Sequence, residues 1–228
     1  MNVIEVKKLT KTYNDSEVKV HAVQGIDLEI QEGEFTAIVG PSGCGKTTFL
    51  NMLGGLDQPT EGNIRIGDTM VHDLKPSELI DFRLHNIGFV FQAYNLIPVL
   101  TAKENVEFIM QLQGKSKEER DKRAISLLTE VGLGDRVDAR PSRLSGGQQQ
   151  RVAVARALAS KPKFVLADEP TANLDSTSTE TLLDIMEKLN REENITFIFS
   201  THDARVVNKA RRVIQLEDGK IIKDERKA

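Results

Sequence analysis

The chain is poor in residues that mark several classes of protein. Its 228 residues include no tryptophan, two tyrosines and one cysteine, Cys44. A single cysteine excludes an internal disulfide and favours a reducing compartment. No apolar run approaches the roughly 20 residues that a membrane-spanning helix needs, and the first residues lack the apolar centre of a signal peptide. We therefore expect a cytoplasmic chain, which does not prevent it from serving a membrane complex.

An excess of basic residues is also missing. There are 31 Lys and Arg against 34 Asp and Glu, which gives a formal net charge of −3. Proteins that coat nucleic acid usually carry a basic excess for phosphate contacts, so we expect no nucleic-acid partner. Hydrophobic residues make up 39% and charged residues 29%, as in ordinary globular proteins. The length fits one large domain, or one domain with an inserted lobe.

Strand and helix patterns alternate along the chain, and a mostly helical stretch interrupts them. β-Branched residues and turn signals predict strands at 3–13, 18–30, 35–40, 86–92, 163–169 and 195–201, with strand pairs at 60–71 and 212–223. Apolar residues at three- and four-residue spacing predict helices after Gly45, at 76–85, 178–193 and 203–210, and through most of 101–160. This layout indicates an α/β core that is split by a helical insert.

A glycine-rich loop, "GPSGCGKTT", follows the apolar run 35–39 and precedes a helical pattern. It fits G-x-x-x-x-G-K-[ST], in which backbone N–H groups and the helix start face phosphate oxygens. Lys46 would reach the β- and γ-phosphates, and the Thr47 hydroxyl would ligate Mg²⁺. A chance match in a chain of this length has odds on the order of one in a hundred. The loop residues expected to bind nucleotide are Gly40, Pro41, Ser42, Gly43, Cys44, Gly45, Lys46, Thr47 and Thr48.

Two carboxylates end the predicted strand "KFVLADE". Asp168 fits the carboxylate that holds Mg²⁺ in nucleoside triphosphatases. Glu169, one position further, would accept a proton from an attacking water. The alternative is an ordinary strand end with solvated acids, and the phosphate loop makes that alternative less favoured.

The stretch "LSGGQ" covers residues 144–148. Ser145 is a natural helix N-cap, and Gly146 and Gly147 open the helix that follows. This is a second helix start suited to an anion, here without a lysine. Two such sites in one chain indicate either two nucleotides or two halves of one site that are completed across a dimer.

Together these motifs, in this order, resemble the nucleotide-binding subunit of ATP-binding cassette (ABC) transporters over essentially the whole chain. The resemblance implies an α/β fold: a P-loop ABC ATPase core with an N-terminal antiparallel β subdomain and an inserted α-helical subdomain. It implies one nucleotide-binding domain over 1–228, with the helical insert at about 93–160. "GPSGCGKTT" matches the Walker A loop, "FVLADE" matches Walker B and "LSGGQ" matches the signature sequence, including Gln148.

Further roles follow only from this resemblance. Gln92 matches the Q-loop glutamine, which senses Mg²⁺ and links to the membrane partner, and Asp175 matches the D-loop. His202 matches the switch histidine at the γ-phosphate, and Tyr13 matches the aromatic residue that stacks on adenine. Tyr13 as a plain strand aromatic and His202 as a structural loop histidine remain open alternatives. We interpret Cys44 as a small space-filling residue rather than a nucleophile, and "GKSKEERDKR" (114–123) as a solvated helix face.

Four stretches narrow the resemblance to one branch of the family: 16–30, 54–68, 91–107 and 166–176. They look like the branch of lipoprotein-releasing, macrolide-efflux and antimicrobial-peptide-resistance ATPases, with the cell-division ATPase as a near relative. Partners in this branch are membrane proteins with few spans and large extracytoplasmic domains. The apolar residues after the Q-loop glutamine predict the docking surface for such a partner. They are Tyr94, Leu96, Ile97 and Leu100. The alternative is that they pack the helical lobe against the core.

The sequence thus predicts an ATPase subunit of a bacterial ABC transporter or mechanotransmission complex. Two copies would meet head to tail with ATP between them, and an integral membrane permease would hold them at the cytoplasmic face of the inner or plasma membrane. The expected catalytic residues are Glu169, His202, Lys46 and Gln92, and the expected Mg²⁺ ligands are Thr47, Gln92 and Asp168.

The main alternative is an ABC ATPase without a membrane partner that acts in DNA repair or on the ribosome. The chain has no heptad run for the long coiled coil of chromosome-type members. It also carries one cassette, whereas ribosome-acting members usually carry two. A binding module with a dead nucleotide site is disfavoured, because Glu169 and His202 are both present.

Overall fold

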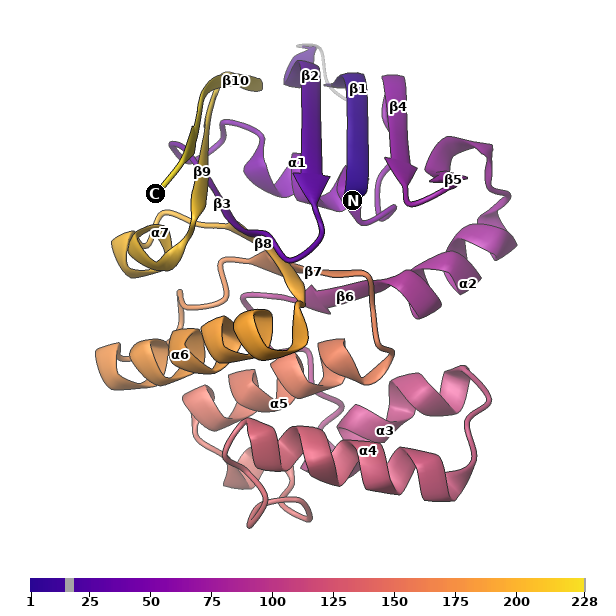
Figure 1. Cartoon of the computed structure of the whole chain (residues 1–228), viewed down its shortest axis with the longest axis vertical. Helices are drawn as coiled ribbons and strands as arrows, with labels where there is room; N and C mark the ends of the chain where they lie inside the picture. The colour runs from indigo at the N-terminus through magenta and orange to yellow at the C-terminus, as the bar shows by residue number, and fades with distance from the viewer. Residues whose placement is uncertain (15–18, 228) are drawn as a thin grey trace.

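The computed structural model describes residues 1–14 and 19–227, and it contains two β-sheets and a group of helices (Figure 1). Most of the predicted turn at 14–16 and the first residue of the predicted second strand lie outside the described residues. The other predicted strands and helices are confirmed, with ends that differ by a few residues. Within the described part, no helix is both long enough and apolar enough to cross a bilayer.

The first sheet is antiparallel, and its strand order is β2-β1-β4-β5. β1 (Asn2–Tyr13) pairs with β2 (Val20–Gln31) and β4 (Glu61–Ile66), and β5 (Thr69–Met70) closes the edge. In β2, the buried Ile26, Leu28 and Ile30 alternate with exposed neighbours and face inward. This sheet is the N-terminal antiparallel subdomain that the sequence predicts.

The second sheet has six strands in the order β10-β9-β3-β8-β7-β6. β3 (Phe35–Val39), β6 (Ile87–Val90), β7 (Phe164–Asp168), β8 (Thr196–Ser200) and β9 (Arg212–Glu217) run parallel, and β10 (Lys220–Arg226) is the antiparallel edge. Every residue of β8 is buried, as expected of a central parallel strand. α1 (Lys46–Leu53) lies between the two sheets, because Phe49 and Met52 share one apolar cluster with both.

Most of the remaining helices lie on the other face of the parallel sheet and extend away from it (Figure 1), whereas the helix before β6 packs its Leu79 and Phe82 against the same cluster as α1. α2 (Pro76–Asn86) leads into β6, and α6 (Ser176–Glu193) and α7 (Ala204–Lys209) follow β7 and β8. α3 (Ala102–Leu112) and α4 (Lys117–Glu130) pack on α5 (Gly146–Ala159), with short 3-10 turns at Val71–Asp73 and Pro141–Arg143. Thr101 and Ser116 cap α3 and α4 through reciprocal bonds with Glu104 and Glu119.

The parallel strands bring the sequence motifs to one edge. β3, β7 and β8 are neighbours, so the segments that follow Val39, Asp168 and Ser200 emerge side by side. The carboxyl ends of parallel strands are the usual place for a ligand in an open α/β sheet. The candidate site is therefore at this edge.

Candidate functional site

The glycine-rich loop runs from the end of β3 to the start of α1, and its backbone excludes side chains at two positions. Gly45 caps α1 in a left-handed conformation, with φ of 100°. A Cβ at Gly45 would lie 2.1 Å from the carbonyl oxygen of Ala22, and one at Gly40 would lie 2.2 Å from that of Leu216. The two outer glycines of the motif are therefore required by close backbone approach.

Lys46 is buried inside this loop, with 9% of the residue exposed. Its ammonium donates to the carbonyl oxygens of Gly40 at 2.7 Å and Pro41 at 3.0 Å, and the Cys44 sulfur lies 4.0 Å away. No carboxylate of the described residues forms an ion pair with it. A buried cation without a counter-charge is costly, so the loop favours an anion. Cys44, 4% exposed, fills space beside it.

Thr47 and Asp168 bring a hydroxyl and a carboxylate together from separate elements. The Thr47 hydroxyl, in the first turn of α1, donates to the two carboxylate oxygens of Asp168 at 3.1 and 3.2 Å. Among the described residues there is no cluster of three or more His, Cys, Asp and Glu side chains that would hold a metal alone. Mg²⁺ commonly takes only one or two protein oxygens together with substrate phosphates and water, and this oxygen-only pair fits it.

Glu169 and His202 meet across the ends of β7 and β8. The His202 Nδ1 and a Glu169 carboxylate oxygen are 2.8 Å apart, and the Thr201 hydroxyl donates to the other oxygen at 3.4 Å. The Glu169 backbone is left-handed, with φ of 46°, and its N–H donates to the Ser200 carbonyl at 2.8 Å. A non-glycine residue in this region is strained, so the surrounding contacts must hold it in place.

A polar clamp between Thr171 and Asp203 joins the same two turns just beyond this pair. The hydroxyl of Thr171, 2% exposed, donates to the Asp203 carboxylate at 2.9 Å. Asp203 also accepts from the backbone N–H and the guanidinium of Arg205 at 2.8 to 3.2 Å. These bonds, the Arg205 side chain first, lower the pKa of Asp203 to about 2. This clamp could not be predicted from the sequence, where its only local sign is an Asp at the N-cap of α7.

Tyr13 ends β1 with its ring fixed by two neighbours. Its hydroxyl donates to Asp57 at 2.6 Å, and the Lys11 ammonium lies 4.8 Å from the ring centroid. Burial and the Asp57 contact raise the pKa of Tyr13. The fixed ring is suited to stacking a flat group.

The signature residues begin α5. The Ser145 hydroxyl accepts from the Gln148 N–H at 3.3 Å, and the Gln148 side chain accepts from the Ser145 N–H at 2.9 Å, which confirms the predicted N-cap. Gly147 packs closely on α6, where an added Cβ would lie 2.6 Å from the Ser178 hydroxyl. In Figure 1 the start of α1 and the signature helix lie in different parts of the molecule. One chain therefore does not bring its own glycine-rich loop and signature together.

Two other predicted site residues have local roles in the structure. Asp175 caps α6 by accepting from the Ser178 N–H at 2.9 Å, and its bonds to Ser178 lower its pKa. Gln92 is exposed two residues after Val90, which pairs with Ala167 of β7. Its backbone carbonyl accepts from the Asn173 side chain at 3.1 Å, so the loop after β6 contacts the loop after β7.

Two polar side chains of α5 tie the signature helix to these loops, and the sequence argument missed both. Gln150, fully buried, donates to the carbonyl oxygens of Pro170 at 2.7 Å and Phe91 at 3.2 Å. Arg156 donates to the carbonyl of Tyr94 at 2.9 Å and to that of Asn95, and burial lowers its pKa. Both are polar positions in a helix whose other residues from Val152 to Ala159 are buried and apolar, and this is the signal that would have found them.

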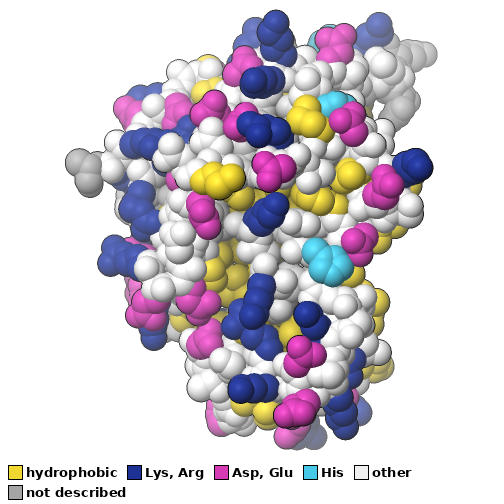
Figure 2. All heavy atoms as spheres, turned by 45° about the vertical axis from the view of Figure 1, so that its right-hand side comes forward, with side chains coloured by type: hydrophobic (Ala, Val, Ile, Leu, Met, Phe, Trp, Pro, Cys, Tyr) yellow, Lys and Arg dark blue, Asp and Glu magenta, His cyan; other side chains and the backbone are white. Residues whose placement is uncertain are grey.

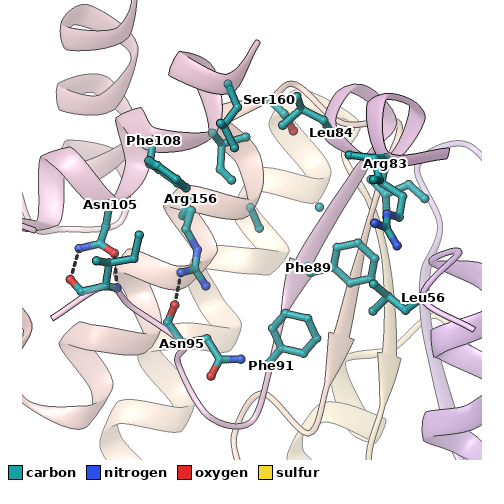
Figure 3. A pocket seen from close by; sticks show the side chains of 17 residues that line it. Leu56, Arg83, Leu84, Phe89, Phe91, Asn95, Asn105, Phe108, Arg156 and Ser160 are labelled. Atoms are coloured by element: carbon teal, nitrogen blue, oxygen red, sulfur yellow. Dashed lines mark hydrogen bonds between the residues drawn. The ribbon is translucent and has the colours of Figure 1, made fainter. Parts of the chain in front are cut away.

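An apolar groove of about 620 Å³ lies between α2, β6 and α3. In Figure 3, Leu56, Phe89 and Phe91 line one side and Phe108 the other, with Arg156 between them and bonded to Asn95. Several of its large apolar residues are exposed: Leu56 at 46%, Ile80 at 60%, Phe108 at 37% and Leu112 at 56%. Monomers rarely expose so many large apolar side chains together without a partner.

The predicted docking residues divide between this groove and the interior. Ile97 lines the groove, whereas Leu96 packs against the core cluster under the helices. Tyr94 is half-buried, and its hydroxyl reaches the Asn173 carbonyl at 3.4 Å. Leu100 is also partly buried. Exposed apolar surface thus comes as much from α2 and α3 as from the loop after Gln92.

Comparison with known proteins gives the same family throughout. The sequence model of the ABC transporter family matches residues 23–172. The uncharacterized ABC transporter ATP-binding protein MJ0796 of Methanocaldococcus jannaschii is 47% identical over 228 residues, which cover 98% of this chain and 97% of MJ0796. The macrolide export ATP-binding/permease protein MacB of Syntrophobacter fumaroxidans is 46% identical over 223 residues, which cover 97% of this chain but 31% of MacB.

The solved structures agree with this. A dimeric post-hydrolysis state of the ATP-binding cassette MJ0796, bound to ADP and Pi, has a TM-score of 0.89 at 45% identity and covers 98% of both chains. A second dimeric structure of MJ0796 also has a TM-score of 0.89, at 46% identity. The predicted fold class is confirmed, and so is the branch that includes the macrolide-export ATPases. The chain spans about a third of the length of the MacB relative.

Proposed function

Since the chain belongs to the ABC transporter family and is an ATP-binding, ATP-hydrolysing cassette, we propose that residues 1–228 form one nucleotide-binding domain with its helical insert at about 93–160. It hydrolyses ATP to ADP and phosphate and couples this to movement of a membrane permease. The observation that carries the proposal is the buried, uncompensated Lys46 beside the Thr47–Asp168 and Glu169–His202 pairs.

In this proposal each catalytic residue has a separate task. Glu169 accepts a proton from the attacking water, and the strained turn after β7 keeps its carboxylate at the strand edge. Lys46 and His202 stabilise negative charge on the transferring phosphoryl group. Tyr13 stacks on the adenine, and the glycine-rich loop from Gly40 to Thr48 binds the phosphates.

We also assign a Mg²⁺ site to this edge. Thr47 and Asp168 would bind the ion, because their oxygens already converge, and Gln92 would join from the neighbouring loop. The ion would neutralise charge on the β- and γ-phosphates. Thr47, at the start of α1, thus orients the nucleotide. Gln92 couples nucleotide binding to the loop 92–95, which Arg156 holds against α5.

The active unit is a head-to-tail homodimer. Ser145, Gly146, Gly147 and Gln148 of one chain complete the ATP site of the other, and Asp175 lies at the contact between them. Two findings support this: the signature lies apart from the glycine-rich loop within one chain (Figure 1), and the related MJ0796 cassettes are dimeric. Closing on ATP and opening after hydrolysis supplies the movement.

The permease docks in the apolar groove beside the Gln92 loop (Figure 3). Ile97 and the exposed Ile80, Phe108 and Leu112 would receive apolar side chains of a cytoplasmic segment of the permease. MacB relatives, which are named ATP-binding/permease proteins, support a membrane partner. The chain would then sit at the cytoplasmic face of the membrane, held through the permease. Nothing in these relatives favours the alternative of a cassette in DNA repair or on the ribosome.

Glu169→Gln tests this function. The amide cannot accept the proton, so hydrolysis should stop while ATP still binds and holds two chains together. Size-exclusion chromatography with ATP and Mg²⁺ should show a dimer for Glu169→Gln. Adding Ser145→Arg should abolish that dimer, because the new side chain would crowd the partner's γ-phosphate. A Glu169→Gln chain that stays monomeric with saturating ATP would contradict the shared site.

A further inference from the structure

The charged run 114–123 does more than face solvent. Its basic residues Lys115, Lys122 and Arg123 line a cavity of about 450 Å³, together with Lys161 from the segment after α5. Met110 and Ala159 form part of its apolar wall. The cavity therefore combines an apolar surface with four cationic side chains from separate parts of the chain.

One acid, Glu119, also lines the cavity, so the four cations leave an excess of positive charge there. Asp121 pairs with Lys103 at 2.5 Å, and Glu119 bonds to the backbone N–H and hydroxyl of Ser116. Among the described residues, none of the four cations forms an ion pair. The Arg123 Nε is buried without a hydrogen-bond partner, and its Nη2 reaches only the Leu158 carbonyl, at 3.4 Å. The whole chain has a net charge of −3, so the positive charge at this cavity is a local feature of the surface.

The cavity adjoins the docking groove. Ser160 lines both, and α3 contributes to both. Figure 2 shows Lys and Arg side chains gathered just below the middle of the molecule, with Asp and Glu side chains beside them. If the permease docks in the groove, the adjoining surface lies close to the bilayer in which the permease is embedded.

We propose that this basic cavity binds the phosphate headgroup of an anionic phospholipid beside the docked permease. The proposal rests on the proposed function, which brings this face to the membrane. The cations attract the phosphate, and the apolar wall with the lysine stems accepts the glycerol and the first methylene groups. A second, lipid contact next to the permease contact would orient the cassette on the membrane.

Vesicle sedimentation with the intact chain tests the proposal. The probes are vesicles of phosphatidylcholine alone and vesicles with roughly 30% phosphatidylglycerol, at low and high salt. The variant is Lys122→Gln/Lys161→Gln, in which both positions are exposed. The control is Lys188→Gln/Lys223→Gln, with the same change of charge on α6 and β10 and with both side chains exposed.

Wild type and control should bind the anionic vesicles in preference to the neutral ones, and salt should weaken this binding. The cavity variant should bind about 25-fold more weakly, since each lysine near an anionic surface contributes about fivefold. Equal binding by variant and control, or no preference of wild type for anionic vesicles, would overturn the proposal.

Co-purification with the permease separates this proposal from the function on which it rests. A cavity variant that binds vesicles normally but loses the permease would show that the cavity takes an acidic segment of the permease, and the lipid proposal would be wrong. Failure of the proposed function would be seen in a different result. The groove variant Ile80→Ser/Leu112→Ser would then still co-purify with the permease, whatever the vesicle binding shows.

Discussion

Thr171→Val should slow ATP hydrolysis without weakening ATP binding. The substitution keeps the shape of the side chain and removes only the hydroxyl that donates to Asp203 at 2.9 Å. That bond links the turn that carries Glu169 to the turn that carries His202. Without it, the strained Glu169 backbone is held by fewer contacts, chiefly its N–H bond to the Ser200 carbonyl.

The size of the effect follows from the contacts that remain. A hydrogen bond to a charged group contributes roughly 1.5–3 kcal/mol, and Asp203 keeps its bonds to Arg205, so we expect about 1.5 kcal/mol of lost stability. For a domain of this length that lowers the melting temperature by about 3–6 °C. A small displacement of catalytic groups reduces turnover by about 10- to 100-fold.

The assay compares kcat and KM for ATP with the melting temperature of the same preparation. Thr181→Val is the matched control, since the exposed Thr181 hydroxyl donates only to the carbonyl of Thr177 in the same helix. The control should keep both turnover and melting temperature. If Thr171→Val lowers the melting temperature but leaves kcat unchanged, the clamp serves folding alone and the reasoning is refuted.

Three further predictions concern single contacts. Lys46→Ala should reduce ATP hydrolysis by orders of magnitude, because it removes the buried charge at the phosphates; a wild-type rate would reject the phosphate loop assignment. The pKa of Asp203 is lowered to about 2, so its ionisation stabilises the fold above pH 4, and this contribution is lost as the pH falls through 2. The free energy of unfolding, measured by urea denaturation, should therefore fall less between pH 4 and 2 for Asp203→Asn than for wild type. Ile80→Ser/Leu112→Ser should keep basal ATPase activity and melting temperature but lose the permease in co-purification, whereas the exposed pair Ile125→Ser/Ile222→Ser should keep it.

Most of the fold could be predicted from the sequence, because the signals were local. Alternating β-branched residues predict the antiparallel strands, and Gly45 and Gly54 mark the limits of α1. The path of the loop before α3 could not be predicted. Residues 95–100 are not helical, because Pro98 interrupts the pattern and the buried Asn105 side chain binds the loop at Ile97 and Leu100. That contact spans several residues and has no local sequence sign.

The candidate site was predictable where a motif carries its own geometry. Thr47 meets Asp168, and Glu169 meets His202, because each pair sits at the ends of neighbouring elements. The contacts that hold these pairs were not predictable. The partners of Gln150 and Arg156 are backbone carbonyls, and the partner of Thr171 is the carboxylate of Asp203. All of these partners are distant in the sequence, so only the folded chain brings them together. For the same reason, the sequence did not show that α2 and α3 contribute exposed apolar side chains to the groove, as Ile80 and Phe108 do.

Mixing two inactive chains tests the central claim, a site shared between two copies, most directly. Lys46→Ala disables the glycine-rich loop of one chain, and Ser145→Arg disables the signature of the other. In a head-to-tail dimer of these two chains, one site combines the intact loop of the Ser145→Arg chain with the intact signature of the Lys46→Ala chain. The mixture should recover about a quarter of the wild-type ATPase rate, since half of the dimers are mixed and each has one intact site. A mixture as inactive as its two components would contradict the shared site.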